Sequence, residues 1–181
     1  MSNDTFSEVE QLSTSDGAAA AIEKVVETLR ANKEYFSLFD ALLLRKKHAM
    51  GLPVAQPTSL DDVPEEQTEE FEQAYVDAAR EVGGLLLADG KIPQAWPYFR
   101  TIRETEPVKA ALEALDTRRD ADEETEALIG VALYEGAHPV KGLEIMLRTH
   151  GTCNTVTAMD QQMQQLPSDD QKSASALLVR E

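Results

Sequence analysis

Residues 135–154 of this sequence carry side chains that can do chemistry. Carboxylate, imidazole, ammonium and thiol groups transfer protons, bind metal ions or attack substrates in enzymes. His150 and Cys153 are close enough in sequence to allow, in principle, a thiolate–imidazole pair. We therefore treat this string as a candidate enzyme, small-ligand or metal-binding site, made of Glu135, His138, Lys141, His150 and Cys153.

A metal ion in this string is not predicted. His138 and His150 flank a predicted helix, and the residues between them span about 18 Å at about 1.5 Å per residue. Zinc lies about 2 Å from each ligand atom, so one ion cannot reach both histidines across that helix. His150 and Cys153 supply only two local ligands, fewer than a zinc site uses. We expect neither a metal nor a cofactor.

Ordinary structural roles also account for the string. Gly136 and Gly151 are typical helix ends, Pro139 is typical of a helix start, and His150 is favourable near a helix C-terminus. Cys153 fits a small buried apolar position. The sequence contains no phosphate-binding Gly-Lys-Ser/Thr loop, no His-Glu-x-x-His and no Gly-x-Ser-x-Gly. No catalytic residue is therefore predicted, and an enzyme is the less favoured class.

Charge and composition narrow the partners. The 181 residues carry a net charge of −16, which disfavours nucleic acid and anionic membrane surfaces. The single cysteine excludes an internal disulfide and suits a reducing compartment. The sequence has no basic-then-apolar leader and no apolar run near the roughly 20 residues of a membrane helix. We expect a cytoplasmic protein, and an end inside an amphipathic pattern favours a longer parent chain.

The elements that must position these side chains are all helical. Ile22, Val25, Val26 and Leu29 follow the spacing of one buried helix face, and no stretch alternates with period two. Residues 1–15 read as a flexible acidic N-terminal tail, and 52–64 as a proline-rich internal loop. We predict one helical domain over 16–181, with about eight to nine helices packed as antiparallel pairs.

A run of basic residues ends the helix that precedes this loop. The run has two interpretations, an anion-binding patch or favourable charge at a helix C-terminus, and the second is preferred. The acidic residues at the start of the following helix favour a solvated face over a metal site. The basic residues are Arg45, Lys46, Lys47 and His48.

Residues 76–107 resemble a tetratricopeptide helix pair. The family pattern places small residues in the first helix and at the turn, an alanine and an aromatic residue in the second helix, and a proline at its end. A weaker echo follows about 47 residues later, where the family period is roughly 34. The resemblance implies an irregular α-α superhelix. The positions that match are Gly83, Gly90, Ala95, Phe99 and Pro107.

The same resemblance implies a groove that binds a peptide or protein segment. Families that grip a C-terminal carboxylate place an Asn one turn after a basic residue, but Gly84 follows Arg80 here, so no carboxylate clamp is predicted. The function expected from sequence is a non-enzymatic binding scaffold of unknown partner. The site at 135–154 is the alternative, and self-association is a third possibility. The expected groove residues are Asp77, Arg80, Gly84, Leu87 and Ala88.

Overall fold

The computed structural model describes residues 17–162 and 168–179, so the predicted tail at 1–15 lies outside the described residues. No β-strand occurs in these two ranges, which confirms the all-α prediction. The chain divides into two compact units, unit 1 (Met1–Leu86) and unit 2 (Leu87–Glu181), which are described separately below. The prediction of one domain over 16–181 stays a prediction.

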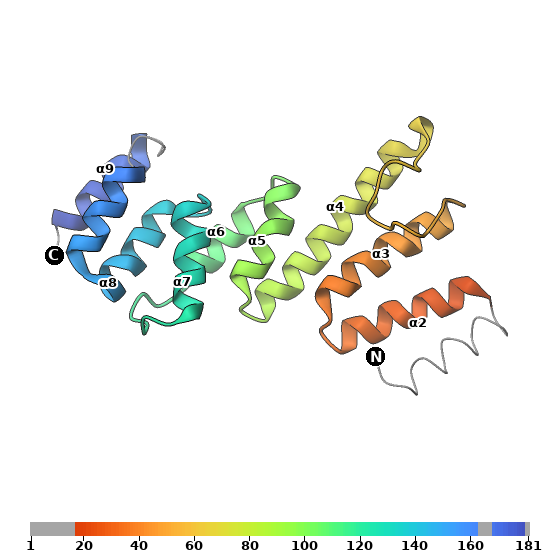
Figure 1. The fold of residues 1–181 in the computed structure, drawn as a ribbon, viewed down its shortest axis with the longest axis horizontal. Coiled ribbons are helices and arrows are strands. Elements are labelled where there is room, and N and C mark those ends of the chain that lie inside the picture. The colour runs from red at the N-terminus through yellow and green to blue at the C-terminus, as the bar shows by residue number, and fades with distance from the viewer. Residues whose placement is uncertain (1–16, 163–167, 180–181) are drawn as a thin grey trace. The chain divides into compact units, whose positions relative to one another are not determined.

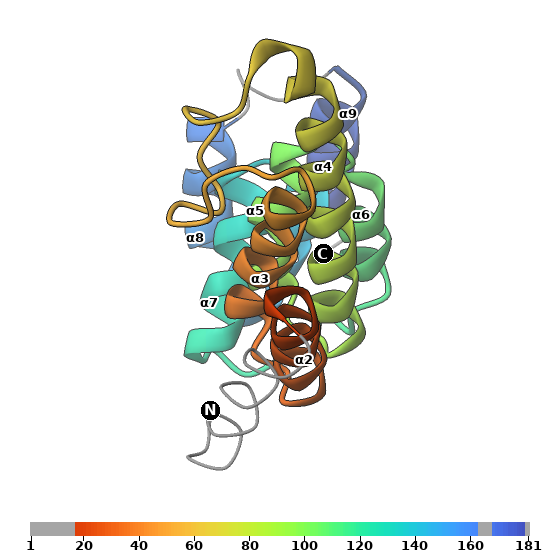
Figure 2. The ribbon, with the colours of Figure 1, turned by 90° about the vertical axis from the view of Figure 1, so that its right-hand side faces the viewer.

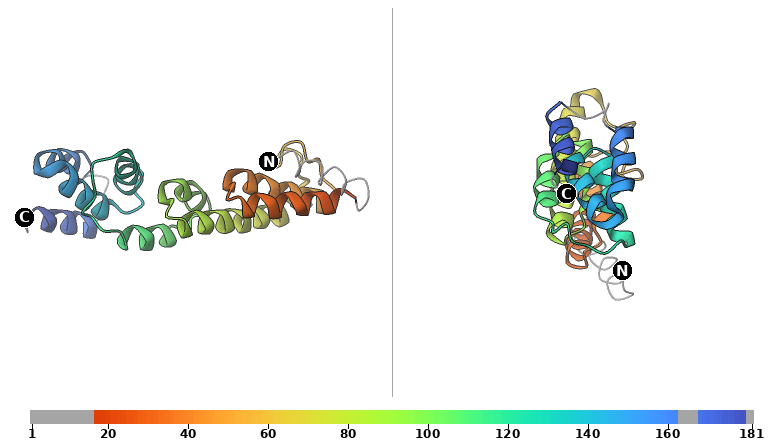
Figure 3. Two further views of the ribbon diagram at one scale, coloured as in Figure 1. Left: turned by 90° about the horizontal axis from the view of Figure 1, so that it is seen from below. Right: turned by 90° about the vertical axis from the view of Figure 1, so that its left-hand side faces the viewer.

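Unit 1 contains α2 (Ala18–Ala31), α3 (Tyr35–Ala49) and most of α4 (Glu65–Ala88) (Figure 1). Helix α2 ends at Ala31 with Asn32 as its C-cap, and Lys33 follows in the left-handed region at φ 59°. The N–H of Glu34 then bonds to the carbonyl of Leu29, which closes the turn into α3. Helices α2 and α3 therefore form an antiparallel hairpin (Figure 3).

Helix α4 packs on this hairpin through aromatic and charged side chains. The rings of Phe39 and Tyr75 meet edge to face, with centroids 5.1 Å apart. Arg30 of α2 forms an ion pair with Glu81 of α4. Residues 52–64 form the predicted loop between α3 and α4 (Figure 2). The core of unit 1 is apolar and includes Val26, Leu38, Leu43, Phe71 and Val82.

The helices of unit 2 start and stop close to the predicted signals. Pro93 and Pro107 lie in the first turns of their helices, and Asp122 caps α7 by accepting the N–H of Thr125 at 2.9 Å. Gly90 adopts φ 74° at the end of α4, a conformation that glycine favours. The α-helices are α5 (Ile92–Thr101), α6 (Glu106–Glu113), α7 (Glu123–Ile129), α8 (Pro139–Gln162) and α9 (Ser168–Val179).

Two features of unit 2 differ from the sequence expectation. The helix that begins with α7 continues as a π-helix, η1 (Gly130–Tyr134), before Gly136 ends it. Helix α8 bends at Gly151, whose φ of 79° and ψ of 174° are almost confined to glycine (Figure 1). The second half of α8 therefore starts soon after Gly151, whereas the sequence indicated only that a helix ends there.

Unit 2 has its own core, to which η1, both halves of α8 and α9 contribute. Gly142 allows η1 and α8 to approach closely, because a Cβ at this position would lie 2.8 Å from the backbone nitrogen of Leu133. The buried cluster consists of Ile129, Leu133, Leu143, Ile145, Met146, Ala158, Met159 and Ala174.

Candidate functional site

The 135–150 segment, from Glu135 to His150, holds four of the five candidate ligand-site residues. Glu135 follows η1, and its carboxylate accepts a hydrogen bond of 2.9 Å from the indole Nε1 of Trp96. The guanidinium of Arg100 lies 3.3 Å from the same oxygen. Trp96 is buried, so its N–H needs a partner. Glu135 provides one and thereby joins the end of η1 to α5.

His138 caps the start of α8. Its Nδ1 accepts a long hydrogen bond of 3.4 Å from the backbone N–H of Lys141. An accepting Nδ1 leaves the proton of a neutral imidazole on Nε2, which lies 3.1 Å from the carboxylate of Glu113. The ring of His138 therefore joins α8 to α6.

Lys141 contacts the same end of α6. Its Nζ donates to the carbonyl of Leu115 at 3.0 Å and lies 3.4 Å from the carbonyl of Glu113. The last carbonyls of a helix have no helical partner, so an ammonium group that reaches them stabilises the helix end. The side chain is only 11% exposed and also pairs with Glu144.

His150 and Cys153 lie on either side of the bend at Gly151. The Nε2 of His150 is 2.6 Å from the carboxylate of Glu126 in α7, and its Nδ1 is 2.7 Å from the hydroxyl of Thr149. Cys153 is exposed, so the expectation of a buried apolar cysteine is wrong. The bend turns the neighbouring positions Thr155 and Ala158 toward the core instead. Between these two described residues, the structure records no thiol–imidazole hydrogen bond.

One hollow of about 490 Å³ in unit 2 brings two of the five residues together. Glu135 and His138 line it, together with Tyr134 and Asp170, whereas Lys141, His150 and Cys153 do not. In the described part of the chain, no three His, Cys, Asp or Glu side chains are grouped so as to hold a metal ion. Four of the five predicted ligand-site residues therefore bond to α5, α6 or α7 or to the end of such a helix, and the five do not converge on one cavity.

The groove positions inferred from the tetratricopeptide resemblance follow α4. Asp77, Arg80 and Gly84 are exposed on the part of α4 in unit 1. Leu87 is half-buried and Ala88 is exposed at the start of unit 2. The carboxylate of Asp77 accepts hydrogen bonds from Gln73 and Arg80. Of the five positions, Asp77 alone lines a hollow described here.

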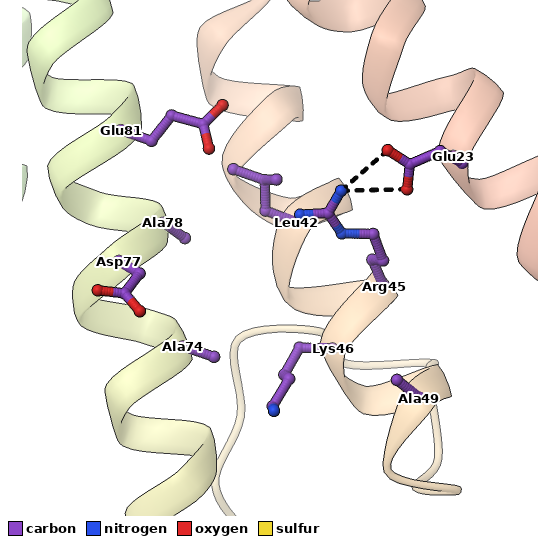
Figure 4. A pocket seen from close by; sticks show the side chains of 9 residues that line it. All are labelled: Glu23, Leu42, Arg45, Lys46, Ala49, Ala74, Asp77, Ala78 and Glu81. Carbon is purple, nitrogen blue, oxygen red and sulfur yellow. Dashed lines mark hydrogen bonds and ion pairs between the residues drawn. The ribbon is translucent and has the colours of Figure 1, made fainter.

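That hollow, of about 490 Å³, lies on the α3–α4 face of unit 1 (Figure 4). Helices α3 and α4 form its walls, α2 contributes Glu23, and small or apolar side chains lie between the walls. Basic side chains lie on α3 and carboxylates on α4, and the carboxylate of Glu23 lies beside Arg45. The α3–α4 groove is lined by Glu23, Leu42, Arg45, Lys46, Ala49, Ala74, Asp77, Ala78 and Glu81.

A second hollow of about 460 Å³ adjoins the first and shares Lys46, Ala74 and Asp77 with it. It continues along α4 toward the start of that helix, where Glu66 and Glu69 line it. We include it in the α3–α4 groove. The groove therefore follows α4 from Glu66 to Glu81.

Ion pairs across this surface are exposed. Arg45 lies 3.0 Å from Glu23, and Lys46 pairs with Glu70. Exposed pairs contribute about 0–1 kcal/mol each, so the groups can exchange partners at little cost. The charged walls of the groove are therefore accessible to a binding partner.

Lys47, which follows Arg45 and Lys46 in the basic run, is buried. Its side chain is 0% exposed, and its Nζ donates to the carbonyl of Gln56 at 2.7 Å and lies 3.3 Å from Asp62. The ammonium also lies 5.4 Å from the ring centroid of Phe71. The basic run is therefore neither one anion patch nor simply helix-end charge. Lys47 holds the 52–64 loop against α3 and α4.

Sequence reasoning missed the α3 wall of the groove. The sequence interpretation treated Arg45 and Lys46 only as favourable charge at a helix end. The spacing of residues along the helix could have distinguished them from the buried Lys47. Leu43 and Lys47 are four residues apart and share the buried face, whereas Arg45 and Lys46 fall beside it.

Comparisons with known proteins found no match. No family model matches the chain, and neither does any curated protein or solved structure. In residues 17–162 and 168–179, no helix combines the length and apolar character needed to cross a membrane.

Proposed function

We propose that this protein is a non-enzymatic scaffold that binds a peptide or protein segment in the α3–α4 groove. The observation that carries the proposal is the length of the groove along α4. The 15 residue steps from Glu66 to Glu81 span about 22 Å at about 1.5 Å per residue. A surface of this length suits a chain segment better than a compact small molecule.

The chemistry of the groove suits the same class of partner. Ala74 and Ala78 project little from α4, so the backbone of a bound segment can come close to the helix. Charged groups on both walls are available to fix the register of the segment. The lining contains no histidine and no cysteine, and no reaction is proposed for it.

The tetratricopeptide resemblance favours the same class of function, since that family binds peptide segments in helical grooves, but it does not by itself favour the α3–α4 groove. The stripe expected from the resemblance shares Asp77 with the α3–α4 groove. The 135–150 segment is not proposed as a reaction site, because Glu135, His138 and Lys141 bond to other helices of unit 2.

Peptide display against the complete chain tests the proposal. Selected peptides are titrated by fluorescence anisotropy against the protein and against Ala74→Arg, which places a long cation in the groove. Ala88→Arg is the matched control, because it makes the same change at an exposed position of α4 outside the groove. Circular dichroism verifies that both variants keep their helicity.

We expect Ala74→Arg to weaken binding at least about tenfold, equivalent to about 1.4 kcal/mol, and Ala88→Arg to leave it within about twofold. Loss of binding in Ala88→Arg alone would place the contact on the stripe expected from the resemblance and contradict the groove. Failure to enrich any peptide over an unrelated acidic protein would contradict the scaffold proposal itself.

A further inference from the structure

The two walls of the α3–α4 groove differ in charge, and this difference indicates what kind of segment would fit. The inference rests on the proposed function, that the groove binds a peptide or protein segment. Arg45 and Lys46 line the α3 side. Figure 4 shows Asp77 and Glu81 on α4 and Lys46 on α3. The guanidinium of Arg45 lies beside Glu23 of α2. The acidic wall continues past Asp77 through Glu70, Glu69 and Glu66.

The acidic wall consists of two groups of carboxylates, seven positions apart from Glu70 to Asp77, which is close to two helical turns. Glu66 and Glu70 are four positions apart, as are Asp77 and Glu81, so each pair lies on one face of α4. A helix that lies along α4 presents side chains at the same repeat of about 5.4 Å. An extended segment presents same-face side chains about every 6.6 Å and loses register over the length of the groove. The spacing therefore fits a helical partner.

The carboxylates of this wall are accessible. Glu66 and Glu69 are exposed and have no side-chain partner among the described residues. The ion-pair partners of Asp77 and Glu81 are the exposed or half-buried Arg80 and Arg30. Asp77 also accepts a hydrogen bond from Gln73, and Glu70 pairs with Lys46 of α3. Cationic side chains of a partner can therefore reach the wall without opening the core.

We propose that the groove binds an amphipathic α-helix of another protein, about four turns long, with Lys or Arg along one edge of its apolar stripe and Asp or Glu along the other. The basic edge faces Glu66, Asp77 and Glu81, and the acidic edge faces Arg45 and Lys46. The apolar stripe packs between the walls against Ala49 of α3 and Ala74 of α4. Turning such a helix end for end exchanges its edges, so the two walls also set its direction.

Three synthetic helices with one apolar stripe and one length test the charge pattern. The first has one basic and one acidic edge, the second has two basic edges, and the third has two acidic edges. Each is titrated by fluorescence anisotropy against the complete protein at about 50 and 300 mM salt, where exposed charge pairs are screened to different extents. The double variant Arg45→Glu/Lys46→Glu and the control His48→Glu are measured in parallel.

We expect the mixed-edge helix to bind at least about tenfold more tightly than the two-acidic helix at low salt, with a smaller ratio at high salt. The double variant makes both walls acidic, so it should prefer the two-basic helix. His48 is exposed and does not line the groove, so His48→Glu should keep the original preference.

Equal binding of the three helices, or the same preference in the double variant, would overturn the charge pattern. A displayed peptide can contain a proline in the middle of the segment and still lose binding in Ala74→Arg. Such a peptide would contradict the inference that the partner is helical, because proline breaks a helix. In both cases the groove remains a binding site, so the proposed function stands. If Ala74→Arg weakened the binding of no displayed peptide, the proposed function of the groove would be contradicted, and this inference with it.

Discussion

The α3–α4 groove of unit 1 and the 135–150 segment of unit 2 are both rich in charged side chains, but they use them in opposite ways. In the segment, Glu135 and Lys141 bond to groups of preceding helices. In the groove, Arg45 and Asp77 line an open surface and have exposed partners. The difference teaches that a dense run of titratable residues does not identify a site. The groups that their polar atoms already bind decide whether a ligand can use them.

Two lysines give the closest comparison between the units. Lys47 is 0% exposed and holds a loop through the carbonyl of Gln56, while Lys141 is 11% exposed and binds the carbonyl of Leu115 at a helix end. Both are structural, but Lys47 packs its whole stem in the core. Burial should therefore separate the effects of removing them.

The largest expected effect is that of Lys47→Ala. The change leaves a cavity and removes the partner of Asp62, so it should lower the free energy of unfolding by about 3 kcal/mol. Lys141→Ala should cost about 1 kcal/mol, because it removes hydrogen bonds at a helix end but its stem is not fully buried. The only tryptophan, Trp96, is in unit 2, so hydrogen exchange of α3 and α4 is the measurement for unit 1.

His48→Ala is the control for this pair, since His48 is the exposed neighbour of Lys47 and should change stability by less than about 0.5 kcal/mol. Equal losses in Lys47→Ala and Lys141→Ala would break the comparison, because burial would then not distinguish the two lysines.

Gly142→Ala should have the next largest effect and would sharpen the account of the segment. The added Cβ would lie 2.8 Å from the backbone of Leu133, so η1 and α8 must separate. The free energy of unfolding should fall by about 2 kcal/mol. Urea denaturation followed by Trp96 fluorescence measures this change. Gly84→Ala in α4 meets nothing within 4 Å and should instead stabilise its helix by about 0.5–1 kcal/mol. A Gly142→Ala variant that is as stable as the unchanged protein, or more stable, would show that the close approach is not rigid.

Arg103→Gly in unit 2 should have a smaller effect, an increase in the free energy of unfolding. Arg103 has φ 61° after α5, a region that costs residues other than glycine roughly 1–2 kcal/mol. Part of this gain is offset by the greater freedom of glycine in the unfolded chain, which leaves a net stabilisation of about 0.5–1 kcal/mol. Thermal unfolding measures it, and Arg103→Ala, which keeps the strain, should show no gain.

The smallest effect is a pH dependence at the start of α7. Hydrogen bonds from Thr125, above all from its backbone N–H, lower the pKa of Asp122 below 3.8. A carboxyl with a lowered pKa contributes stability above its unfolded pKa and loses it as pH falls through the folded pKa. Asp122→Ala should therefore reduce the urea midpoint at pH 7 and much less near pH 2.

Asp122→Asn separates the cap from the charge, since asparagine caps a helix equally well without a carboxyl group. This variant should keep most of the stability at pH 7 and lose the difference between neutral and acid pH. An Asp122→Ala effect that stays constant over this range would show that the ionised carboxylate does not stabilise α7.

Local patterns predicted most of the fold. Gly51, Gly90 and Gly136 adopt positive φ at helix ends, and Pro107 and Pro139 lie in first turns, as the sequence indicates. These signals are interpretable because helix periodicity and capping involve residues within one or two turns. The π-helix and the bend at Gly151 were not predicted, because they accommodate packing between elements.

The sequence by itself determined that the described chain is helical, where most of its helices begin and end, and which residues bring charge to the segment at 135–150. Only the tertiary structure decided that Lys47 is buried while Arg45 faces a groove, and that Glu135 binds Trp96, 39 positions earlier. The physical reason is distance along the chain. Helix formation depends on neighbours a few residues apart, whereas burial and hydrogen-bond partners depend on residues that only folding brings together.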